Sequence, residues 1–215
     1  MRITVLVSTR NRLKKLQRML ESLPASASGR EVRPLVVCDG DEATYRTLPV
    51  GIATLLVPEW SGQTRCRNLA LERIRGPVVY ATDDIVFKPG AIEAAAAEMD
   101  RLFPAWDGVV GFTQEGNRFN PAGVALVGEP FIARYPGRHL FFDGYFHFAA
   151  QEVHRAASKL GLFSLSAKAV VYHYHPAHHR EELDRTHQDA RRWKTRDMAL
   201  KSRREAAGLT WGISA

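Results

Sequence analysis

The stretch YATDDIVFKPG, residues 80–90, carries the strongest structural signal in this chain. Residues 78–81 have strand character and run directly into two adjacent carboxylates, Asp83 and Asp84. Two neighbouring carboxylates repel each other, so a helix N-terminus, a basic neighbour or a divalent cation normally offsets their charge. A buried strand that ends on such a pair predicts a polar site at the carboxyl end of a sheet.

Strand-like and helix-like segments alternate through the first half of the chain. Asn11 can cap the first helix, in which leucines recur at helical spacing, and Pro24 is expected to end it. This alternation predicts a mainly parallel central sheet with helices on both faces. The expected strands are residues 3–8, 35–38, 52–57 and 78–81, and the expected helices are residues 11–23, 64–74 and 91–102.

The second half has a weaker pattern, because residues 103–148 are rich in glycine, proline and aromatic side chains. Repeats and low-complexity linkers are absent, so we expect one α/β domain followed by a charged helical extension. The expected elements are short strands at 108–112 and 124–127, a helix at 151–160, a strand at 164–172 and a helical tail at 179–207.

Composition indicates an ordinary globular protein of 215 residues, with 45% hydrophobic and 25% charged residues. No apolar run is long enough to predict a membrane-spanning helix, and the N-terminal segment is typical of a first strand rather than of a signal peptide. Cys38 and Cys66 lack the spacing of a metal site. We therefore expect a reduced, cytoplasmic setting.

The formal net charge of +7 is concentrated near the C-terminus. Residues 191–204 contain seven basic residues and one acid, Asp197, a net charge of +6. Such a segment attracts polyanions such as nucleic acid, anionic lipid or charged glycan, but it is equally typical of a solvated helix face. The basic residues are Arg191, Arg192, Lys194, Arg196, Lys201, Arg203 and Arg204.

Polar side chains follow several of the expected strands. In open α/β sheets, ligands bind at the carboxyl ends of strands, so these side chains predict one shared site, although any one of them could instead belong to a turn or cap. The segment after the first strand, STRNR, is not a glycine-rich phosphate-binding loop. The residues concerned are Thr9, Arg10, Asp39, Asp83, Asp84, His173 and His175.

Three blocks of the sequence resemble family 2-type glycosyltransferases with the GT-A fold. They are STRNRLKKLQRMLESL (8–23), GQTRCRNLALERIRGPVVYATDDIVFKPGAI (62–92) and AVVYHYHP (169–176), and they occur in the expected order. The resemblance covers roughly residues 1–102 and 141–176. It implies a GT-A domain over residues 1–178, with a nucleotide-sugar-binding half at 1–102, an acceptor half at 103–178 and a basic extension at 179–215.

The resemblance implies a hexosyl- or pentosyltransferase that uses a nucleotide-diphosphate sugar, with a UDP-sugar as the expected donor. Thr9, Arg10 and Asp39 match positions that hold the nucleoside. Arg67 matches an arginine near the base and the phosphates, and Asp83 also belongs to the donor-binding set. These assignments rest on the matched blocks.

The resemblance also implies a divalent metal, held by Asp84 and Asp83 with His173 and, as a second candidate, His175. A Mg²⁺ or Mn²⁺ ion would stabilise the charge on a departing diphosphate, and an imidazole ligand favours Mn²⁺. Thr82 departs from a strict DxD pattern. The alternative is that one carboxylate merely caps the following turn.

An inverting transfer requires a carboxylate that accepts the proton of the acceptor hydroxyl. Glu152 is the first expectation for this base, and Asp143 is the second. Glu152 is equally explained as a first-turn acid that the helix dipole favours. If neither is essential, a retaining mechanism or a degenerate enzyme follows.

The acceptor is left open between a glycan and a hydroxylated base of modified DNA, which would have to be flipped out of a duplex. Trp60, on the loop before the second block, is either a lid residue or a packing anchor. The alternative function is that of a non-catalytic module with a degenerate GT-A fold, which binds nucleotides or polyanions.

Overall fold

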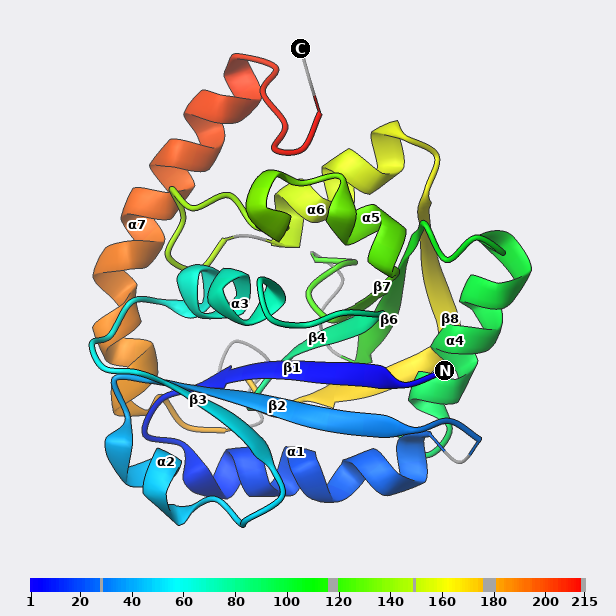
Figure 1. The fold of residues 1–215 in the computed structure, drawn as a ribbon. Coiled ribbons are helices and arrows are strands. Elements are labelled where there is room, and N and C mark those ends of the chain that lie inside the picture. Colours follow the sequence, from blue (N-terminus) through cyan, green and yellow to red (C-terminus); the bar gives the residue numbers. More distant parts are fainter. Residues whose placement is uncertain (28, 116–119, 149, 176–180, 214–215) are drawn as a thin grey trace.

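The chain forms an α/β fold around one mixed sheet, shown by a computed structural model (Figure 1). Its strands lie in the order β3-β2-β1-β4-β7-β6-β8-β5. Residues 1–27, 29–115, 120–148, 150–175 and 181–213 are described. Within them the strands are β1 (Ile3–Thr9), β2 (Val32–Asp39), β3 (Ala53–Val57), β4 (Val78–Thr82), β5 (Ile85–Phe87), β6 (Val109–Glu115), β7 (Ala125–Val127) and β8 (Phe163–His173).

Helices cover both faces of this sheet. Residues of α1 and α4 pack in one buried apolar cluster, and residues of α3 and α6 pack in a second one. The helices are α1 (Leu13–Ser26), α2 (Glu42–Thr47), α3 (Gln63–Leu71), α4 (Ala91–Leu102), α5 (Glu129–Ala133), α6 (Ala150–Lys159) and α7 (Arg185–Ala206), with a 3-10 turn, η1, at Pro136–Arg138. No helix in the described ranges is long and apolar enough to cross a membrane.

The parallel part of the sheet aligns the strand ends that the sequence marks as polar. β1 pairs in parallel with both β2 and β4, and Thr9 lies opposite Cys38 while Ser8 lies opposite Thr82. Because the three strands end at the same level, the side chains that follow them share one edge of the sheet.

The prediction of a mainly parallel sheet is only partly confirmed. β6 and β8 are also parallel, but β7 runs antiparallel to both β4 and β6, and β5 runs antiparallel to β8. β5 was not predicted, because its three residues are too few to show the alternation of a strand. The chain therefore turns at the carboxylate pair and re-enters the sheet at its far edge.

Two predicted boundaries of the first helix were wrong. Pro24 does not end α1, which continues to Ser26; a proline this near the end of a helix removes a single backbone hydrogen bond. Asn11 does not cap α1, because Arg12 is the N-cap residue and Asn11 has a left-handed φ of 55°. Its backbone N–H instead donates to Asp41 at 2.7 Å.

Helix α7 confirms the predicted helical extension over its described part and places it beside the carboxyl edge of the sheet (Figure 1). Its amino end is fixed to the start of α1, since Asp184 accepts hydrogen bonds from Arg12 and Lys15. Its carboxyl end is fixed to α6 through Arg204 and Glu152. Helix α7 thus links the two ends of the domain across the predicted site.

Candidate active site at the carboxyl edge of the sheet

The carboxylate pair lies at the centre of a buried polar cluster. Asp83 and Asp84 follow β4 and are only 4% and 3% exposed. Thr9, at the end of β1, donates its hydroxyl hydrogen to Oδ2 of Asp83 over 2.8 Å. The ends of β1 and β4 therefore meet as the sequence predicted.

Arg12 is the cation that faces both carboxylates. Its Nη1 donates to Oδ1 of Asp83 at 3.1 Å and lies 3.9 Å from Oδ2 of Asp84. Its Nε and Nη2 donate to Asp184 over 2.8 and 2.9 Å. The side chain is 11% exposed, so this ion-pair network is largely shielded from water. Arg12 lies within the first matched block but was not predicted as a site residue.

Histidines approach Asp84 from β8 and from α7. Nε2 of His173 lies 3.3 Å from Oδ1 of Asp84, and Nε2 of His187 lies 3.9 Å from its Oδ2. The ring of His175 makes edge contacts with both histidines, at centroid distances of 5.4 and 4.9 Å. His173 and His175 thus lie beside the carboxylates as predicted. His187 joins them because α7 returns to this edge of the sheet.

Burial and neighbouring charges move the pKa values of the two carboxyl groups in opposite directions. Burial raises the pKa of Asp83 to about 6, and Arg12 and Thr9 only partly oppose this effect. Burial alone would also raise the pKa of Asp84, but His173 and Arg12 outweigh it and hold that pKa well below its usual range. The pair therefore contains one firmly ionised carboxylate and one that protonates readily.

The arrangement at His173 suits a cation between the imidazole and Asp84. Nδ1 of His173 lies 3.0 Å from Oε1 of Gln114, whose amide nitrogen donates to the carbonyl of Asn120. Because Oε1 can only accept, Nδ1 carries the hydrogen, and in the neutral ring Nε2 presents a lone pair to Asp84. Oδ1 of Asp84 is buried and accepts no hydrogen bond of normal geometry. A proton or a metal ion could bridge these two atoms.

The side chains around Asp84 are chemically suited to a divalent cation, since carboxylate oxygens and one imidazole nitrogen are ligands that Mn²⁺ accepts. The spacing of the side chains is not that of a closed metal site. Among the described residues, no group of three or more His, Cys, Asp or Glu side chains is arranged to hold a metal ion. Arg12 faces the same oxygens, so a cation would have to displace its guanidinium.

Asp39 holds the loop that leads into α3. It is 4% exposed, and its two oxygens accept hydrogen bonds from the backbone N–H groups of Ser61 and Gly62 at 2.7 and 2.8 Å. Burial raises the pKa of Asp39 in spite of these hydrogen bonds. Asp39 therefore lies at the predicted edge of the sheet and also fixes the backbone there.

Trp60, on that loop, packs between cations and an aromatic ring. The guanidinium of Arg10 lies 4.2 Å from its ring centroid, and that of Arg192 lies 5.6 Å away. Phe146 makes an edge contact with the same ring at 5.0 Å. Arg10 is also paired with Asp189 of α7 at 3.2 Å. Trp60 is thus a packing anchor in this structure, and it lies where α7 meets the β3–α3 loop.

Arg67 is enclosed beneath β4. It is 2% exposed, and its Nη2 donates to the backbone carbonyl of Ala81 at 2.8 Å. The rings of Tyr80 and Phe141 lie 5.3 and 5.4 Å from the guanidinium carbon. Burial lowers the pKa of Arg67 to about 10. In this position Arg67 supports the strand that leads to the carboxylates.

Glu152, the first expectation for the base, lies in a buried hydrogen-bond network rather than at an open site. It is 1% exposed, and both oxygens are already occupied. Tyr145 donates to Oε1 at 2.7 Å, the backbone N–H of Trp211 donates to Oε2 at 2.6 Å, and Arg204 donates to both oxygens. Glu152 therefore fastens the C-terminal segment to α6.

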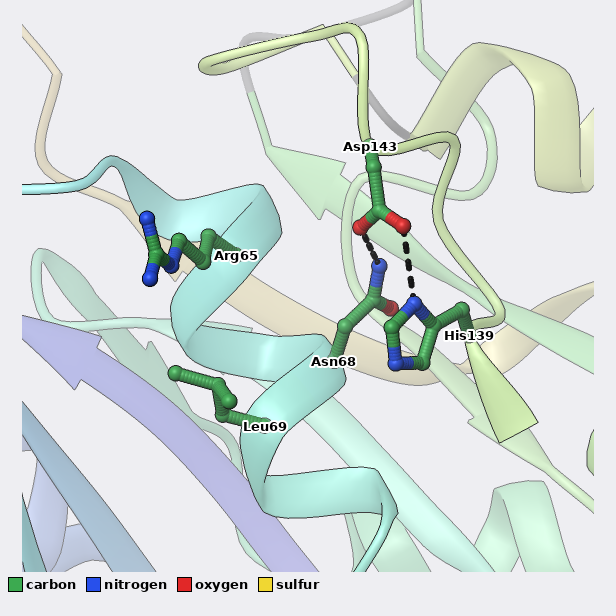
Figure 2. Close-up of a pocket in the computed structure, with 5 residues that line it drawn as sticks. All are labelled: Arg65, Asn68, Leu69, His139 and Asp143. Atoms are coloured by element: carbon green, nitrogen blue, oxygen red, sulfur yellow. Dashed lines mark hydrogen bonds and ion pairs between the residues drawn. The ribbon is translucent and has the colours of Figure 1, made fainter. Parts of the chain in front are cut away.

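Asp143 lines a separate pocket with a volume of about 320 Å³ beside α3 (Figure 2). Its oxygens accept from Nδ2 of Asn68 at 2.7 Å and contact Nδ1 of His139 at 2.8 Å, and its side chain is 56% exposed. Burial alone would lower the pKa of His139, but hydrogen bonds to Asp143 and Glu72 raise it. Asp143 is thus held in place and open to solvent.

His147 is a further side chain near the site that sequence reasoning missed. Its backbone is held on both sides, since its N–H donates to Asp197 at 2.6 Å and its carbonyl accepts from Gln63 at 2.7 Å. Its Nε2 is buried without a hydrogen-bond partner. Burial lowers the pKa of His147 to about 4, and the charges of Arg12 and Arg67 act in the same direction. The aromatic run around His147 gave no signal that distinguished it from core residues.

Solved glycosyltransferase structures share this fold. S. aureus TarS superposes with a TM-score of 0.63 at 18% identity over 80% of this chain and 36% of that one. The mannosyltransferase PcManGT from Pyrobaculum calidifontis, solved with GDP-Man and Mn²⁺, gives 0.62 at 18% identity over 79% of this chain and 56% of that one. TarS 1-349 in complex with UDP-GlcNAc gives 0.61 at 18% identity, over 80% and 58%.

These comparisons establish a GT-A-like fold and no more, because the sequence identities are low. The chain spans less than two thirds of the length of each of these neighbours. No protein-family profile matches the chain. No curated protein sequence matches it either. Membership of family 2 therefore stays a prediction from the matched blocks.

Proposed function

We propose that this protein is a glycosyltransferase that moves a sugar from a nucleotide-diphosphate donor to an acceptor hydroxyl. The observation that carries this proposal is the buried Asp83–Asp84 pair, joined by Thr9 and His173 at the carboxyl edge of a GT-A-like sheet. The neighbours with this fold include one solved with GDP-Man and Mn²⁺ and one solved with UDP-GlcNAc. We propose a nucleotide-sugar donor here by analogy, with a UDP-sugar as the first candidate.

A Mn²⁺ or Mg²⁺ ion would be held by Asp84, Asp83 and His173, with His175 beside them, and would supply Lewis-acid stabilisation of the diphosphate. The chain's own residues prepare this site. Thr9 orients Asp83 by its hydrogen bond, and Gln114 fixes the ring of His173 with Nε2 toward Asp84. We place the nucleoside against Arg10 and Asp39, at the neighbouring strand ends.

Asp143 is the carboxylate that we propose as the proton acceptor in an inverting transfer. Unlike Glu152, it has an exposed side chain, and Asn68 and His139 orient it at a pocket that can admit an acceptor. Replacing Asp143 by Asn should lower kcat by at least about 100-fold with little change in donor binding. Equal kcat for the variant and the wild type would exclude this role.

The acceptor hydroxyl belongs, on this proposal, to a glycan or to a hydroxylated base of DNA. A nucleic-acid acceptor predicts binding that weakens steeply with salt, whereas a neutral glycan does not. The proposed setting is the cytoplasm. Cys38 and Cys66 are both free and buried, as suits a reducing compartment, and burial raises the pKa of the Cys38 thiol to about 12.

The test is thermal unfolding with UDP, GDP, CDP and ADP, each with and without Mn²⁺. A ligand at 100 times its dissociation constant stabilises the fold by about 2.7 kcal/mol, which is easily measured. We expect one nucleotide to raise the Tm in a metal-dependent way, and Asp84→Asn to remove that rise. Glu42→Gln, an exposed acid on α2, is the matched control and should keep it. No rise with any nucleotide would contradict the proposal.

A second function, a non-catalytic nucleotide- or polyanion-binding module, is favoured by one observation. Arg12 already neutralises the carboxylates, so the cluster is electrostatically satisfied without a cation. Measuring whether the protein turns over a nucleotide-sugar donor distinguishes the two functions. Donor hydrolysis or transfer that Asp84→Asn abolishes excludes the module, and donor binding without turnover over a panel of acceptors favours it.

A further inference from the structure

The acids of α7 are all engaged in contacts with the domain. Asp189 pairs with Arg10, Glu205 pairs with Arg155 of α6, and Asp197, 0% exposed, accepts from the backbone N–H groups of residues 146–148. Trp193 lies between Asp189 and Asp197 and stacks on Phe146 at a centroid distance of 4.4 Å. The negative charges of α7 are therefore taken up by contacts with the domain.

Between residues 191 and 203, five bases of α7 are exposed, and two of them, Arg192 and Arg196, also place their guanidinium groups 5.2 and 5.3 Å from the ring of Trp193. Among the described residues, none of the five takes part in an ion pair, whereas Lys201 and Arg204 pair with Glu205 and Glu152. We call this set the outer face of α7. It consists of Arg191, Arg192, Lys194, Arg196 and Arg203.

The charges on this face extend over a length that several backbone phosphates would occupy. Residues 191–203 of a helix rise about 18 Å at 1.5 Å per residue. One strand of duplex DNA carries a phosphate every 3.4 Å along its axis, or about five over that length. Four of the five bases are arginines, whose guanidinium groups bind phosphate oxygens in pairs. Four of the bases, at 191–196, fall within about 8 Å of helix rise and Arg203 lies about 10 Å further on. The density and kind of charge suit a polyphosphate chain.

The same face lacks what a membrane surface would require. Helices that lie in a membrane interface carry large apolar side chains beside their bases. Here Met198, 52% exposed, stands among small or polar neighbours, which are Thr195, Ala199 and Ser202. The outer face also reaches the candidate site, because the guanidinium of Arg192 lies 5.6 Å from the ring of Trp60.

We infer that the outer face of α7 binds the phosphate backbone of nucleic acid. The inference deepens the proposed function by selecting a nucleic-acid acceptor, but the binding itself does not depend on transfer of a sugar. A bound strand would run along α7 and bring its bases past Trp60 and the carboxyl edge of the sheet.

The test is fluorescence anisotropy of a labelled 20-base-pair DNA duplex with the full chain. The variant Arg191→Gln/Lys194→Gln/Arg196→Gln removes three charges from the outer face. Its control, Arg33→Gln/Arg46→Gln/Arg101→Gln, removes three exposed charges from β2, α2 and α4. We expect the first variant to weaken binding at least about tenfold and to reduce the slope of log K against log [NaCl] by about 2.7, and the control to do neither.

Equal losses in the two variants would overturn the inference, since binding would then follow net charge alone. So would tighter binding to heparin, or to vesicles containing phosphatidylserine, than to DNA at the same ionic strength. The thermal shift with nucleotide and Mn²⁺, measured on the same variants, keeps the two proposals apart. If the first variant loses DNA binding but keeps the thermal shift with nucleotide, α7 binds DNA independently of the donor site. If the wild type shows no thermal shift with nucleotide, the proposed donor site is wrong, whatever α7 binds.

Discussion

Arg12 determines the charge balance around Asp83 and Asp84. It contacts both of these carboxylates through one nitrogen and Asp184 through the other two. A divalent cation that binds the pair must displace this contact, so Arg12 and the metal compete. Arg12→Gln should therefore bind Mn²⁺ alone at least about tenfold more tightly than the wild type, which corresponds to about 1.4 kcal/mol.

Electron paramagnetic resonance of free and bound Mn²⁺ measures this without any assay of activity. Lys15→Gln is the matched control, because Lys15 contacts Asp184 but neither carboxylate of the pair. If Arg12→Gln binds Mn²⁺ less tightly than the wild type, Arg12 helps to form the metal site and does not compete for it.

Ionisation of Asp83 should make the stability of the fold depend on pH. Its pKa is raised to about 6 in the folded chain, mainly by burial, from a reference value of 3.8. A raised carboxyl pKa means that the folded state binds the proton more tightly than the unfolded state, so ionisation of Asp83 destabilises the fold at high pH. This cost is complete above pH 6 and disappears as the pH falls from 6 towards 4.

Asp83→Asn should therefore be more stable than the wild type at pH 8, by on the order of 1–2 kcal/mol. The difference should shrink as the pH approaches 4. Urea unfolding at pH 4, 6 and 8 measures it. A variant that is less stable than the wild type at pH 8 would show that the contacts with Arg12 and Thr9 outweigh the burial of the charge.

The sequence alone was enough to predict those site residues that directly follow a strand. Thr9, Asp39 and Asp83 follow predicted strands, and parallel pairing brings strand ends together in any sheet of this kind. The sequence did not predict Arg12 or His187 as site residues. Their positions depend on α7 returning to the first loop, a contact between distant segments that no local pattern encodes.

At the scale of the helices, Glu152 joins α6 to the C-terminal segment. It receives hydrogen bonds from Arg204, Tyr145 and the backbone of Trp211, all within a buried site. Loss of one partner from a buried ion pair costs about 3–5 kcal/mol, because the other charge is left uncompensated. We expect Glu152→Gln to lower the Tm by roughly 6–20 °C for a chain of this size.

Differential scanning calorimetry measures that change, and Glu42→Gln, an exposed acid on α2, is the control. The metal-dependent nucleotide shift should survive in Glu152→Gln at a temperature where the variant is folded. An unchanged Tm together with complete loss of transfer would instead restore Glu152 as the base.

The order of helices and strands was largely predictable, whereas the direction of several strands was not. Periodicity indicates that residues 124–127 form a strand, but the antiparallel pairing of β7 with β4 and β6 depends on where the connecting segments lead. The short elements α2 and α5 were missed, because five or six residues are too few to show a helical period. The contacts of Glu152 were not predictable for a related reason: a first-turn acid looks the same in sequence whether it faces a substrate or an arginine.

At the scale of the whole molecule, α7 is attached to the domain by two different kinds of contact. Its amino half is held by partly exposed ion pairs, Arg12–Asp184 and Arg10–Asp189, in which the two aspartates are 28% and 34% exposed. Its carboxyl half is held by Asp197 and Glu152, which are 0% and 1% exposed. Salt screens charges that reach solvent and has much less effect on buried ones.

Raising NaCl from 0.05 to 0.5 M should therefore increase amide hydrogen exchange in residues 185–193 by at least about threefold and leave residues 197–206 nearly unchanged. Hydrogen exchange with mass spectrometry resolves the two halves, and α4, which is buried against the sheet, is the internal reference. Equal acceleration along the whole of α7 would mean that the helix detaches as one unit. The expected asymmetry would make the amino half, which carries the contacts to Asp84 and Trp60, the part of α7 that can open to admit a nucleotide while the carboxyl half stays fixed.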